Sequence, residues 1–561
     1  MSPATTVGAA LIVLGLFVAQ GIFFISANSQ TYDEAMHLAT GYSYLAKGDF
    51  RLEPQNPPLM KELQALPLFL SYKLPFNPDP KHWRDGDGYL IGQNFLYESR
   101  ISADRMLATG RFVTLLFGSV LIAMTGWWAY RLWRDPAAGI LAMALASLEP
   151  NLVAHSSLVT TDVGMALFSL LTLYLLWEHL NKPTWRLLVA MGLSTGLALA
   201  SKYSAIVLVP LFALIVLACA IGRERHLLPL QEHQSRRTPH KILEAAALIS
   251  LVLFVAVLTL APVYLFQGVH LWFDGLREFL SLSKVGLMAF FLGEYSYQGW
   301  WSYFPMAFLM KTPVGTLALV LASLALYKHG SRLSRYDAIV LVLPVGFFFI
   351  VMTQANVAIG VRHILPVYPL LFVLASRLTT VRFRRPWFSH ALIGIPVLLT
   401  AISSLRIAPH QIAYFNELVG GPDQGYRYLS DSNIDWGQDL KGLRAYVERE
   451  NLPIIYLSYF GTAPPSYYGI RYQYVPGTWP LEWPPLTDRV PDNVLRKILA
   501  ISVYNLQDVS TAYYPLFRWL WSRKPVAKIG YSIFVYDLTN DQEGLTKLQE
   551  TYAGAGMTLV P

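Results

Sequence analysis

Two neighbouring carboxylates, Asp33 and Glu34, directly follow the first long apolar stretch of the chain. The segment around them reads TYDEAMHLATGYSYLAKGDFRLEPQNPPLMK and ends at Lys61. A carboxylate at a bilayer surface can take a proton from a hydroxyl group or bind a cation. It can also be a solvated helix cap, so the other charged residues on the same side of the membrane decide between these interpretations.

Further charged residues recur where apolar stretches end on that side. The full set is Asp33, Glu34, Lys61, Asp162, Lys202, Arg362 and His363. Charge beside hydrocarbon is costly, so such residues usually face a cavity and serve a function. The cations suit an anionic phosphate, and Asp33 suits removal of a proton from a hydroxyl group. Transfer of a sugar from a lipid phosphate needs both a base and cationic stabilisation of the leaving group.

Adjacent helical residues point about 100° apart, so Asp33 and Glu34 cannot share one role. We expect Asp33 to be the base. Glu34 is expected either to support it within the catalytic group or to have a structural role, and Asp162 is the second acidic candidate. Lys61, Lys202 and Arg362 are the predicted phosphate-binding residues.

Two outer residues and one histidine have weaker signals. Tyr297 and Trp300 belong to an aromatic cluster that either contacts the substrate or forms an interfacial aromatic belt. His363 is a further candidate for contact with the substrate. His37 follows Asp33 by four residues and could join a metal site on one helix face. The sequence contains no metal-binding motif, so no metal ligand and no cofactor is assigned, although a divalent metal is possible.

The segment SDSNIDWGQDL contains several acidic residues with two interpretations. Asp431, Asp435 and Asp439 could hold a cation, and their spacing is faintly like that of a calcium loop. Alternatively, Asp435 or Asp439 caps the helix predicted for LKGLRAYVERE, which is the favoured interpretation. In a further alternative the segment lies over the mouth of the active site and contacts the acceptor.

The composition predicts an α-helical polytopic membrane protein. The 561 residues are 54% hydrophobic and 14% charged, whereas soluble domains carry about 25% charged residues. About eleven apolar stretches approach the ~20 residues that a spanning helix needs. They cover residues 7–26, 106–130, 137–154, 163–180, 187–202, 203–222, 243–266, 313–328, 338–353, 364–379 and 388–405.

The basic residues between these stretches predict the orientation. If the N-terminus is cytoplasmic, the inside loops are short and basic, namely 131–135, 178–186, 223–241, 328–337 and 377–387. Lys and Arg concentrate on the cytoplasmic side, so the net charge of +8 reflects topology and not nucleic-acid binding. Two long loops, residues 27–105 and 267–312, then lie outside, where their amphipathic aromatic composition is typical of interfacial helices.

The apolar spans end near residue 405, and the chain is expected to divide there. Residues 1–405 form the predicted transmembrane domain, and residues 406–561 form a C-terminal extracytoplasmic α/β domain of a size that folds alone. The runs LPIIYLSYFG, KILAISVYNL and AKIGYSIFVYDL predict strands, whereas LKGLRAYVEREN and DVSTAYYPLFRWLWSRK predict helices.

Several segments resemble the GT-C glycosyltransferases, and most closely the protein O-mannosyltransferase branch (glycosyltransferase family 39), with the lipid A aminoarabinose transferases as relatives. They span residues 32–440 and include YDEAMHLATGYSYLAKG with NPPLMKELQALPLFL, SLEPNLVAHSSLVTTDVGMALF, GLALASKYSAIVLVP and IGVRHILPVYPLL. The resemblance implies a polyprenyl-phosphate-sugar donor, an inverting transfer and an active site on the outer face. It also implies Asp33 as the base, Asp162 as a second acidic residue, and Lys61 and Lys202 as phosphate ligands.

The chain departs from that family at two points. It carries NPPLMK where protein O-mannosyltransferases carry a HPPLGK-like sequence, and it has no counterpart of the eukaryotic MIR domain. The acceptor therefore stays open between protein, lipid and glycan.

The predicted function is an integral-membrane glycosyltransferase in a bacterial cytoplasmic (inner) membrane. It would transfer a sugar from a polyprenyl-phosphate donor to a hydroxyl acceptor on the outer face. The alternative is a transporter or lipid-linked sugar flippase, which should show repeated halves and charges near the bilayer midplane. Here the charges gather at one surface and no internal repeat is visible. A receptor-like scaffold would leave the segment from Asp33 to Lys61 unexplained.

Overall fold

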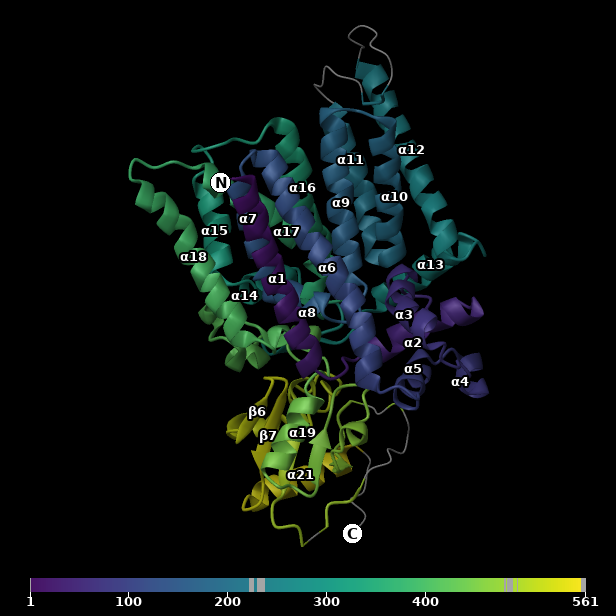
Figure 1. The fold of residues 1–561 in the computed structure, drawn as a ribbon. Coiled ribbons are helices and arrows are strands. Elements are labelled where there is room, and N and C mark those ends of the chain that lie inside the picture. Colours follow the sequence, from purple (N-terminus) through teal and green to yellow (C-terminus); the bar gives the residue numbers. More distant parts are fainter. Residues whose placement is uncertain are drawn as a thin grey trace.

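The structure, a computed structural model, describes residues 2–220, 227–229, 238–478, 481, 488–491 and 493–555. Most of the predicted inside loop 223–241 lies outside these residues. Helices form a long bundle, and the C-terminal domain lies at the end of this bundle opposite the N-terminus (Figure 1). We call the end next to the C-terminal domain the base of the bundle.

Seven helices in the described part of the chain are long and apolar enough to cross a membrane. They are Pro3–Ala27 (α1), Ala103–Trp133 (α6), Asp162–Asn181 (α9), Tyr203–Ala220 (a 3-10 turn that continues as α11, Leu208–Ala220), His240–Val263 (within α12, Thr238–Val263), Arg335–Met352 (α16) and Pro386–Ile407 (α18). The predicted polytopic helical membrane fold is thereby confirmed. The orientation in the membrane stays a prediction.

Two further stretches are bent helix pairs. Pro136–Ser147 (α7) and Pro150–Ser156 (α8) meet at 67°, and Tyr303–Lys311 (α14) and Val314–Ala325 (α15) meet at 112°. A proline at each break explains the bends, because proline has no backbone N–H and favours the start of a new helix. If each pair is one span, the described residues hold up to nine.

Two shorter apolar helices complete the bundle, Trp185–Ser201 (α10) and Val367–Ala375 (α17), the latter continued to Thr380 by a 3-10 turn. The prediction of about eleven spans counts both of them as crossing. The number of spans stays a prediction, since these two helices have fewer than 18 residues.

The outer loop 27–105 folds into four helices beside the base of the bundle (Figure 1). They are Glu34–Lys47 (α2), Leu59–Tyr72 (α3), Pro80–Asp85 (α4) and Gly88–Tyr97 (α5). α2 packs against both α3 and α5 at glycines: a Cβ at Gly41 would lie 2.0 Å from the Lys61 carbonyl oxygen, and one at Gly92 would lie 2.7 Å from Ala35. Glycine thus permits the close approach that brings Lys61 and α5 to α2.

The outer loop 267–312 contains the helix His270–Val285 (α13) and a β-hairpin ahead of α14. Strand Ala289–Phe291 (β1) pairs antiparallel with Glu294–Ser296 (β2). The hairpin is an addition to the helices expected in this loop. Leu292 and Gly293 both have positive φ, at 54° and 92°, which is the backbone of a two-residue hairpin turn.

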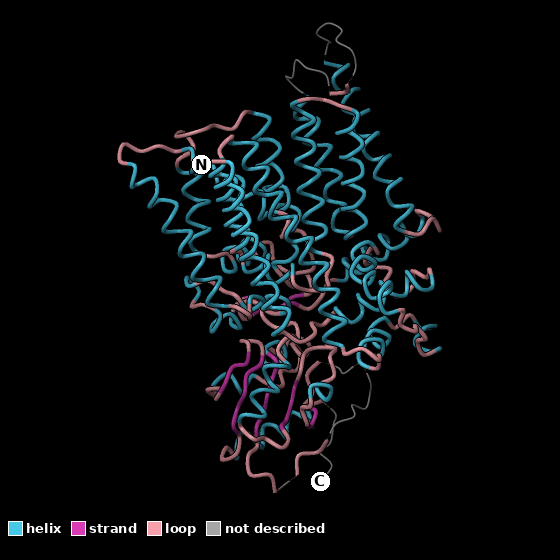
Figure 2. The backbone as a smooth tube through the Cα atoms, in the orientation of Figure 1, coloured by secondary structure: helices cyan, strands magenta, loops and turns pink. Residues whose placement is uncertain are grey.

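The C-terminal region contains a five-stranded mixed sheet in the order β4-β3-β5-β7-β6 (Figure 2). Ile455–Ser458 (β3) is parallel to Tyr472–Tyr474 (β4) and to Ile498–Ser502 (β5). Ile533–Asp537 (β7) is antiparallel to β5 and to Ala527–Ile529 (β6). With the helices Leu440–Arg449 (α19), Val503–Leu506 (α20) and Gln542–Gly554 (α21), this confirms the predicted α/β character.

Two local predictions in this domain need correction. AKIGYSIFVYDL is a hairpin of two strands, β6 and β7, because Gly530 and Tyr531 have positive φ and turn the chain. DVSTAYYPLFRWLWSRK is wrong as a helix, since only Arg518–Ser522 forms a 3-10 turn. The Asp508 carboxylate accepts the amides of Leu516 and Phe517 instead, at 2.8 and 3.0 Å.

Residues 408–439 connect the last bundle helix to α19 and lie against the base of the bundle. Tyr32 N–H donates to the Trp436 carbonyl at 2.8 Å, and Lys311 Nζ donates to the Ile412 carbonyl at 2.6 Å. α18 ends at Ile407, close to the predicted border at 405/406, and the division into two domains stays a prediction. This connecting segment brings residues of the C-terminal region to the acidic loop at Asp33.

Candidate active site

Asp33 lies in the turn before α2 and is partly accessible. Its side chain is 19% exposed. Tyr89 of α5 donates its hydroxyl to Asp33 Oδ1 at 3.2 Å, and Arg362 Nη1 lies 3.9 Å from Oδ2. The carboxylate is therefore oriented by two neighbours yet retains an accessible side.

Asp162, Lys202 and Arg362 gather next to Asp33, as the sequence predicted. Asp162 begins α9, and Lys202 at the end of α10 forms an ion pair with it. Arg362 Nη1 lies 3.9 Å from Asp162 Oδ2, the same separation as to Asp33. Two cations therefore lie next to two carboxylates at the meeting point of four chain segments.

Several polar atoms of this cluster are buried without a hydrogen-bond partner among the described residues. They are Asp162 Oδ2, Arg362 Nε, His363 Nε2 and His155 Nδ1. Buried polar groups are nearly always hydrogen-bonded in folded proteins. Such a concentration of unused donors and acceptors is typical of a site that binds a polar ligand.

Trp436 is a neighbour of this cluster that sequence reasoning missed. The Arg362 guanidinium carbon lies 4.2 Å from the centre of the Trp436 ring, and His155 packs edge-on to the same ring. A cation over an aromatic face is attracted by the ring quadrupole. The only signal in the sequence was an aromatic residue inside the acidic segment SDSNIDWGQDL.

Glu34 lies in a different environment from its neighbour Asp33. It is fully buried and forms a two-point ion pair with Arg111 of α6, at 2.8 and 2.6 Å. The amides of Thr31 and Val159 also donate to it, each at 2.8 Å. Burial alone would raise the pKa of Glu34, but Arg111 lowers it below its usual range.

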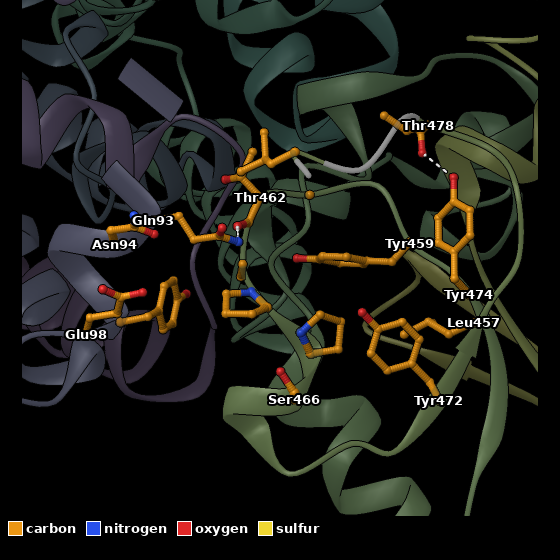
Figure 3. Close-up of a pocket in the computed structure, with 16 residues that line it drawn as sticks. Gln93, Asn94, Glu98, Leu457, Tyr459, Thr462, Ser466, Tyr472, Tyr474 and Thr478 are labelled. Carbon is orange, nitrogen blue, oxygen red and sulfur yellow. Dashed lines mark hydrogen bonds between the residues drawn. The ribbon is translucent and has the colours of Figure 1, made fainter. Parts of the chain in front are cut away.

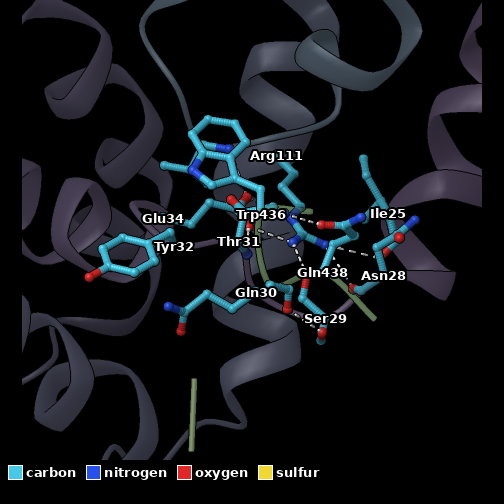
Figure 4. A network of polar contacts seen from close by, with 12 residues as sticks. Ile25, Asn28, Ser29, Gln30, Thr31, Tyr32, Glu34, Arg111, Trp436 and Gln438 are labelled. Atoms are coloured by element: carbon cyan, nitrogen blue, oxygen red, sulfur yellow. Dashed lines mark hydrogen bonds and ion pairs between the residues drawn. The ribbon is translucent and has the colours of Figure 1, made fainter. Parts of the chain in front are cut away.

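Arg111 also fixes the backbone that leads into Asp33. It donates to the carbonyls of Asn28 and Ser29 at 3.0 and 2.7 Å (Figure 4). The Glu34–Arg111 pair thereby holds the turn in place. Among the described residues, the Glu34 carboxylate is already fully hydrogen-bonded within the protein and has no oxygen left to accept a hydrogen bond from a substrate. Sequence reasoning did not single out Arg111, because it lies within an apolar span.

Lys61 lies apart from the Asp33 cluster and is completely buried. Its ammonium group contacts Glu53 Oε2 at 3.1 Å, Tyr44 OH at 3.1 Å and the Asn56 carbonyl at 2.9 Å. Glu53 also contacts His37 Nδ1 at 3.0 Å. Burial would raise the pKa of Glu53, but His37 and Lys61 lower it to about 2.

Glu53 was missed by sequence reasoning, although it precedes Lys61 by eight residues in the same loop. It lines a cavity of 580 Å³ together with Tyr44, Asn56 and residues of α13. Tyr203, which directly follows Lys202, lines the same cavity. The cavity therefore lies between the loop that precedes Lys61 and the residue that follows Lys202.

The acidic segment before α19 serves mainly to fix its own backbone. Asp435 is buried and accepts the amides of Gly437 and Tyr504 at 3.2 and 3.0 Å. The predicted helix cap is wrong in its acceptor: Asp439 occupies the N-cap position, but its side chain accepts no capping hydrogen bond. The Leu440 amide donates to Ser29 Oγ at 3.0 Å instead, since Ser29 comes within reach only in the folded chain.

Asp431 in the same segment interacts electrostatically with Arg362. Burial raises the pKa of Asp431 to about 6, and the positive charge of Arg362 opposes that rise. Its φ of 56° is unusual for a residue other than glycine. Strained backbone of this kind often occurs at functional sites.

The outer aromatic residues lie at the edge of this arrangement. Tyr297 is 45% exposed, and Trp300 packs on Phe291 of the hairpin at 5.3 Å between ring centres. Neither residue has a recorded contact with Asp33 or Asp162. For metal binding, no group of three or more His, Cys, Asp or Glu side chains within the described ranges could hold an ion.

Together these features define an integral membrane protein with a carboxylate–cation site at the base of its helical bundle. A family model described as dolichyl-phosphate-mannose-protein mannosyltransferase matches residues 10–261. The match includes Asp33, Lys61, Asp162 and Lys202. The resemblance to the protein O-mannosyltransferase family is thereby confirmed.

Two kinds of solved structure are similar to this chain. ArnT from Cupriavidus metallidurans, bound to undecaprenyl phosphate, is 12% identical with a TM-score of 0.47, over 95% of this chain and 97% of that chain. The oligosaccharyltransferase AglB from Archaeoglobus fulgidus, in complex with an inhibitory peptide and a dolichol-phosphate, is 15% identical with a TM-score of 0.43, over 79% and 58%. A search of curated protein sequences finds no significant match.

Proposed function

We propose that this protein is a membrane glycosyltransferase that moves a sugar from a polyprenyl-phosphate donor to a hydroxyl acceptor. One observation carries the proposal: a partly accessible carboxylate, Asp33, lies 3.9 Å from Arg362, which is equally far from the Asp162–Lys202 pair. The family match over residues 10–261 supports the choice of donor.

Asp33 is proposed as the general base. A hydroxyl group becomes a better nucleophile as its proton is removed, and the base must lie within hydrogen-bond reach. The Asp33 carboxylate takes the proton as the acceptor oxygen forms a bond to the anomeric carbon. The hydrogen bond from Tyr89 and the charge of Arg362 hold the carboxylate in its orientation.

Lys202 and Arg362 are proposed to bind the donor phosphate. As the new bond forms, the bond between the anomeric carbon and the phosphate oxygen breaks, and polyprenyl phosphate leaves with one additional negative charge. Cations placed where charge develops lower the barrier. Because a single displacement occurs with no covalent sugar–enzyme intermediate, the configuration at the anomeric carbon inverts.

Asp162 is proposed to position the two cations rather than to remove a proton. Its ion pair with Lys202 and its approach to Arg362 leave a buried carboxylate between two positive charges. Such a carboxylate is held in its charged form and keeps both cations near the phosphate.

Lys61 was predicted to bind the phosphate as well. Its complete burial and its contacts with Glu53, Tyr44 and Asn56 favour a positioning role for the α2–α3 loop. The cavity of 580 Å³ between this cluster and Tyr203 is the proposed route by which the donor head group approaches Lys202.

The proposed setting is a bacterial cytoplasmic membrane, with the N-terminus inside and the site and C-terminal domain outside. The basic loops on the N-terminal side support this orientation. Asp33 itself does not distinguish a protein, lipid or glycan acceptor, since any hydroxyl group can give up a proton there.

The decisive experiment supplies the purified full-length protein in lipid nanodiscs with polyprenyl-phosphate sugars and measures release of polyprenyl phosphate. We expect release with at least one donor sugar, and loss of release in Asp33→Asn. Asp423→Asn is the matched control, since its carboxylate is 62% exposed and lies outside the cluster. Movement of the intact donor across the bilayer without cleavage would contradict the proposal and favour a flippase.

A further inference from the structure

A second cavity lies between the outer loop and the C-terminal domain (Figure 3). Its volume is 320 Å³. One wall is α5 and its C-cap, with Gln93, Asn94 and Glu98. The other wall is the sheet and the loop after β3, with Tyr472, Tyr474 and Tyr459. The donor-side residues described above do not line it.

The lining combines flat aromatic rings with uncharged hydrogen-bonding groups. Among the described residues that line the cavity, Glu98 is the only charged one, and no cation is present. The side chains of Asn94 and Glu98 have no hydrogen-bond or ion-pair partner within the described part of the chain. An anionic ligand would meet no counter-charge here, so the lining favours a neutral ligand rich in hydroxyl groups.

The sheet contributes side chains of its edge strand, β4, to the cavity. Tyr472 and Tyr474 are two residues apart on β4, so their side chains point to the same side. A peptide that added a strand would use free backbone N–H and C=O groups at a strand edge. Tyrosine faces with amide and carboxylate side chains opposite them suit a sugar ring, which has an apolar face and polar hydroxyl groups around it.

α5 connects this cavity to the proposed base. Tyr89, which donates to Asp33, is followed by the cavity residues Gln93 and Tyr97 at four-residue spacing, so all three share one helix face. Each such step is about 6 Å along the helix. The cavity therefore begins about one helical turn from the contact with Asp33.

A second connection runs through Thr462 at the cavity wall. Its hydroxyl donates to the Tyr32 carbonyl at 2.6 Å. Gln93 donates to the Thr462 carbonyl at 3.1 Å (Figure 3). Tyr32 also stacks on Phe460, at 5.0 Å between ring centres. The residue next to Asp33 is thus fixed to the same loop that forms the cavity wall.

We propose that this cavity binds a neutral saccharide unit of the acceptor. This inference rests on the proposed function for the role of the bound sugar, whereas the binding itself can be tested alone. A sugar held between Tyr472 and Glu98 would direct a hydroxyl group of the acceptor along α5 to Asp33. The acceptor class is then a glycan or a glycosylated molecule.

The test uses full-length protein in nanodiscs on an array of neutral, amino and acidic glycans. The neutral glycan that binds most tightly on the array is then titrated by microscale thermophoresis to measure its affinity. We expect binding of neutral glycans, and affinity about tenfold lower in Tyr472→Leu and in Glu98→Gln. Tyr514→Leu is the control for loss of a tyrosine, because Tyr514 is 79% exposed and lies outside this cavity.

Asp33→Asn should bind the same glycan with unchanged affinity, which separates binding from transfer. Absence of neutral-glycan binding, wild-type affinity in both cavity variants, or displacement of the glycan by an unglycosylated Ser/Thr peptide would overturn the proposal. Should Tyr472→Leu fold poorly, Glu98→Gln alone decides. Release of polyprenyl phosphate without glycan binding refutes only this inference, and glycan binding without release refutes only the proposed transfer.

Discussion

Two arginines lie next to carboxylates at the base of the bundle, and their surroundings differ. Arg111 contacts Glu34 at two points, at 2.8 and 2.6 Å, and both residues are buried. Arg362 lies 3.9 Å from both Asp33 and Asp162, and its Nε has no hydrogen-bond partner among the described residues. The first is a closed pair, and the second is an open cluster.

The difference in surroundings distinguishes Asp33 from Glu34, two adjacent acidic residues that composition alone does not tell apart. Glu34 accepts four hydrogen bonds from Arg111 and two backbone amides, so its acceptor capacity is used within the protein. The Asp33 side chain accepts one hydrogen bond among the described residues, from Tyr89, and is 19% exposed. A closed pair stabilises the scaffold, whereas an open cluster has the capacity to bind a substrate and to take its proton.

The strongest test of this contrast is Asp33→Asn. The variant keeps the shape of the side chain and loses the base, so turnover should fall by a factor on the order of 10² to 10⁴. Donor affinity should persist, because Lys202 and Arg362 remain. Turnover and donor binding are measured on the same preparation. Near-normal turnover would transfer the role of base to Asp162.

Glu34→Gln should lower the stability of the protein, and any loss of turnover should follow from that loss of stability. Removing one partner of a buried ion pair leaves Arg111 uncompensated, which typically costs about 3–5 kcal/mol. We expect a lower thermal unfolding temperature and lower yield, read by the fluorescence of the protein in detergent. The comparison would break if Glu34→Gln folded normally and lost only turnover.

Lys202→Met should weaken donor binding. Hydrogen bonds to charged groups contribute about 1.5–3 kcal/mol each, so the donor KM is expected to rise by about 10- to 100-fold. Lys61→Met is the paired variant, expected to lower stability with little change in donor KM, because it leaves Glu53 buried and unpaired. Equal effects on donor KM would assign both lysines to the phosphate.

A smaller effect is expected from Asp431 through pH. Its pKa of about 6 means that the group is neutral below this pH and negatively charged above it. As a carboxylate it competes with the donor phosphate for Arg362, so donor affinity should weaken a few-fold as pH rises through 6. Asp431→Asn should flatten this dependence when donor KM is measured from pH 5 to 8. An unchanged profile in the variant would remove Asp431 from the site.

Some local structure followed directly from sequence patterns. The apolar runs LPIIYLSYFG and KILAISVYNL became β3 and β5, and LKGLRAYVEREN became α19. These elements have clear hydrophobic periodicity, which reflects burial of one face. DVSTAYYPLFRWLWSRK failed as a helix because Asp508, a residue outside the apolar pattern, accepts the amides of Leu516 and Phe517.

The sequence by itself determined the membrane class, the α/β character of the C-terminal region, and that Asp33, Asp162, Lys202 and Arg362 lie on one side. Long apolar stretches and the cost of charge beside hydrocarbon are local properties, so they can be read from composition and order. Only the tertiary structure decided that Glu34 belongs to a closed ion pair and Asp33 to an open cluster. Packing of segments distant in the chain brings Arg111 to Glu34 and Trp436 to Arg362. Closure of a loop brings Glu53 to Lys61. Electrostatic interactions depend on these distances in space, which the order of residues does not give.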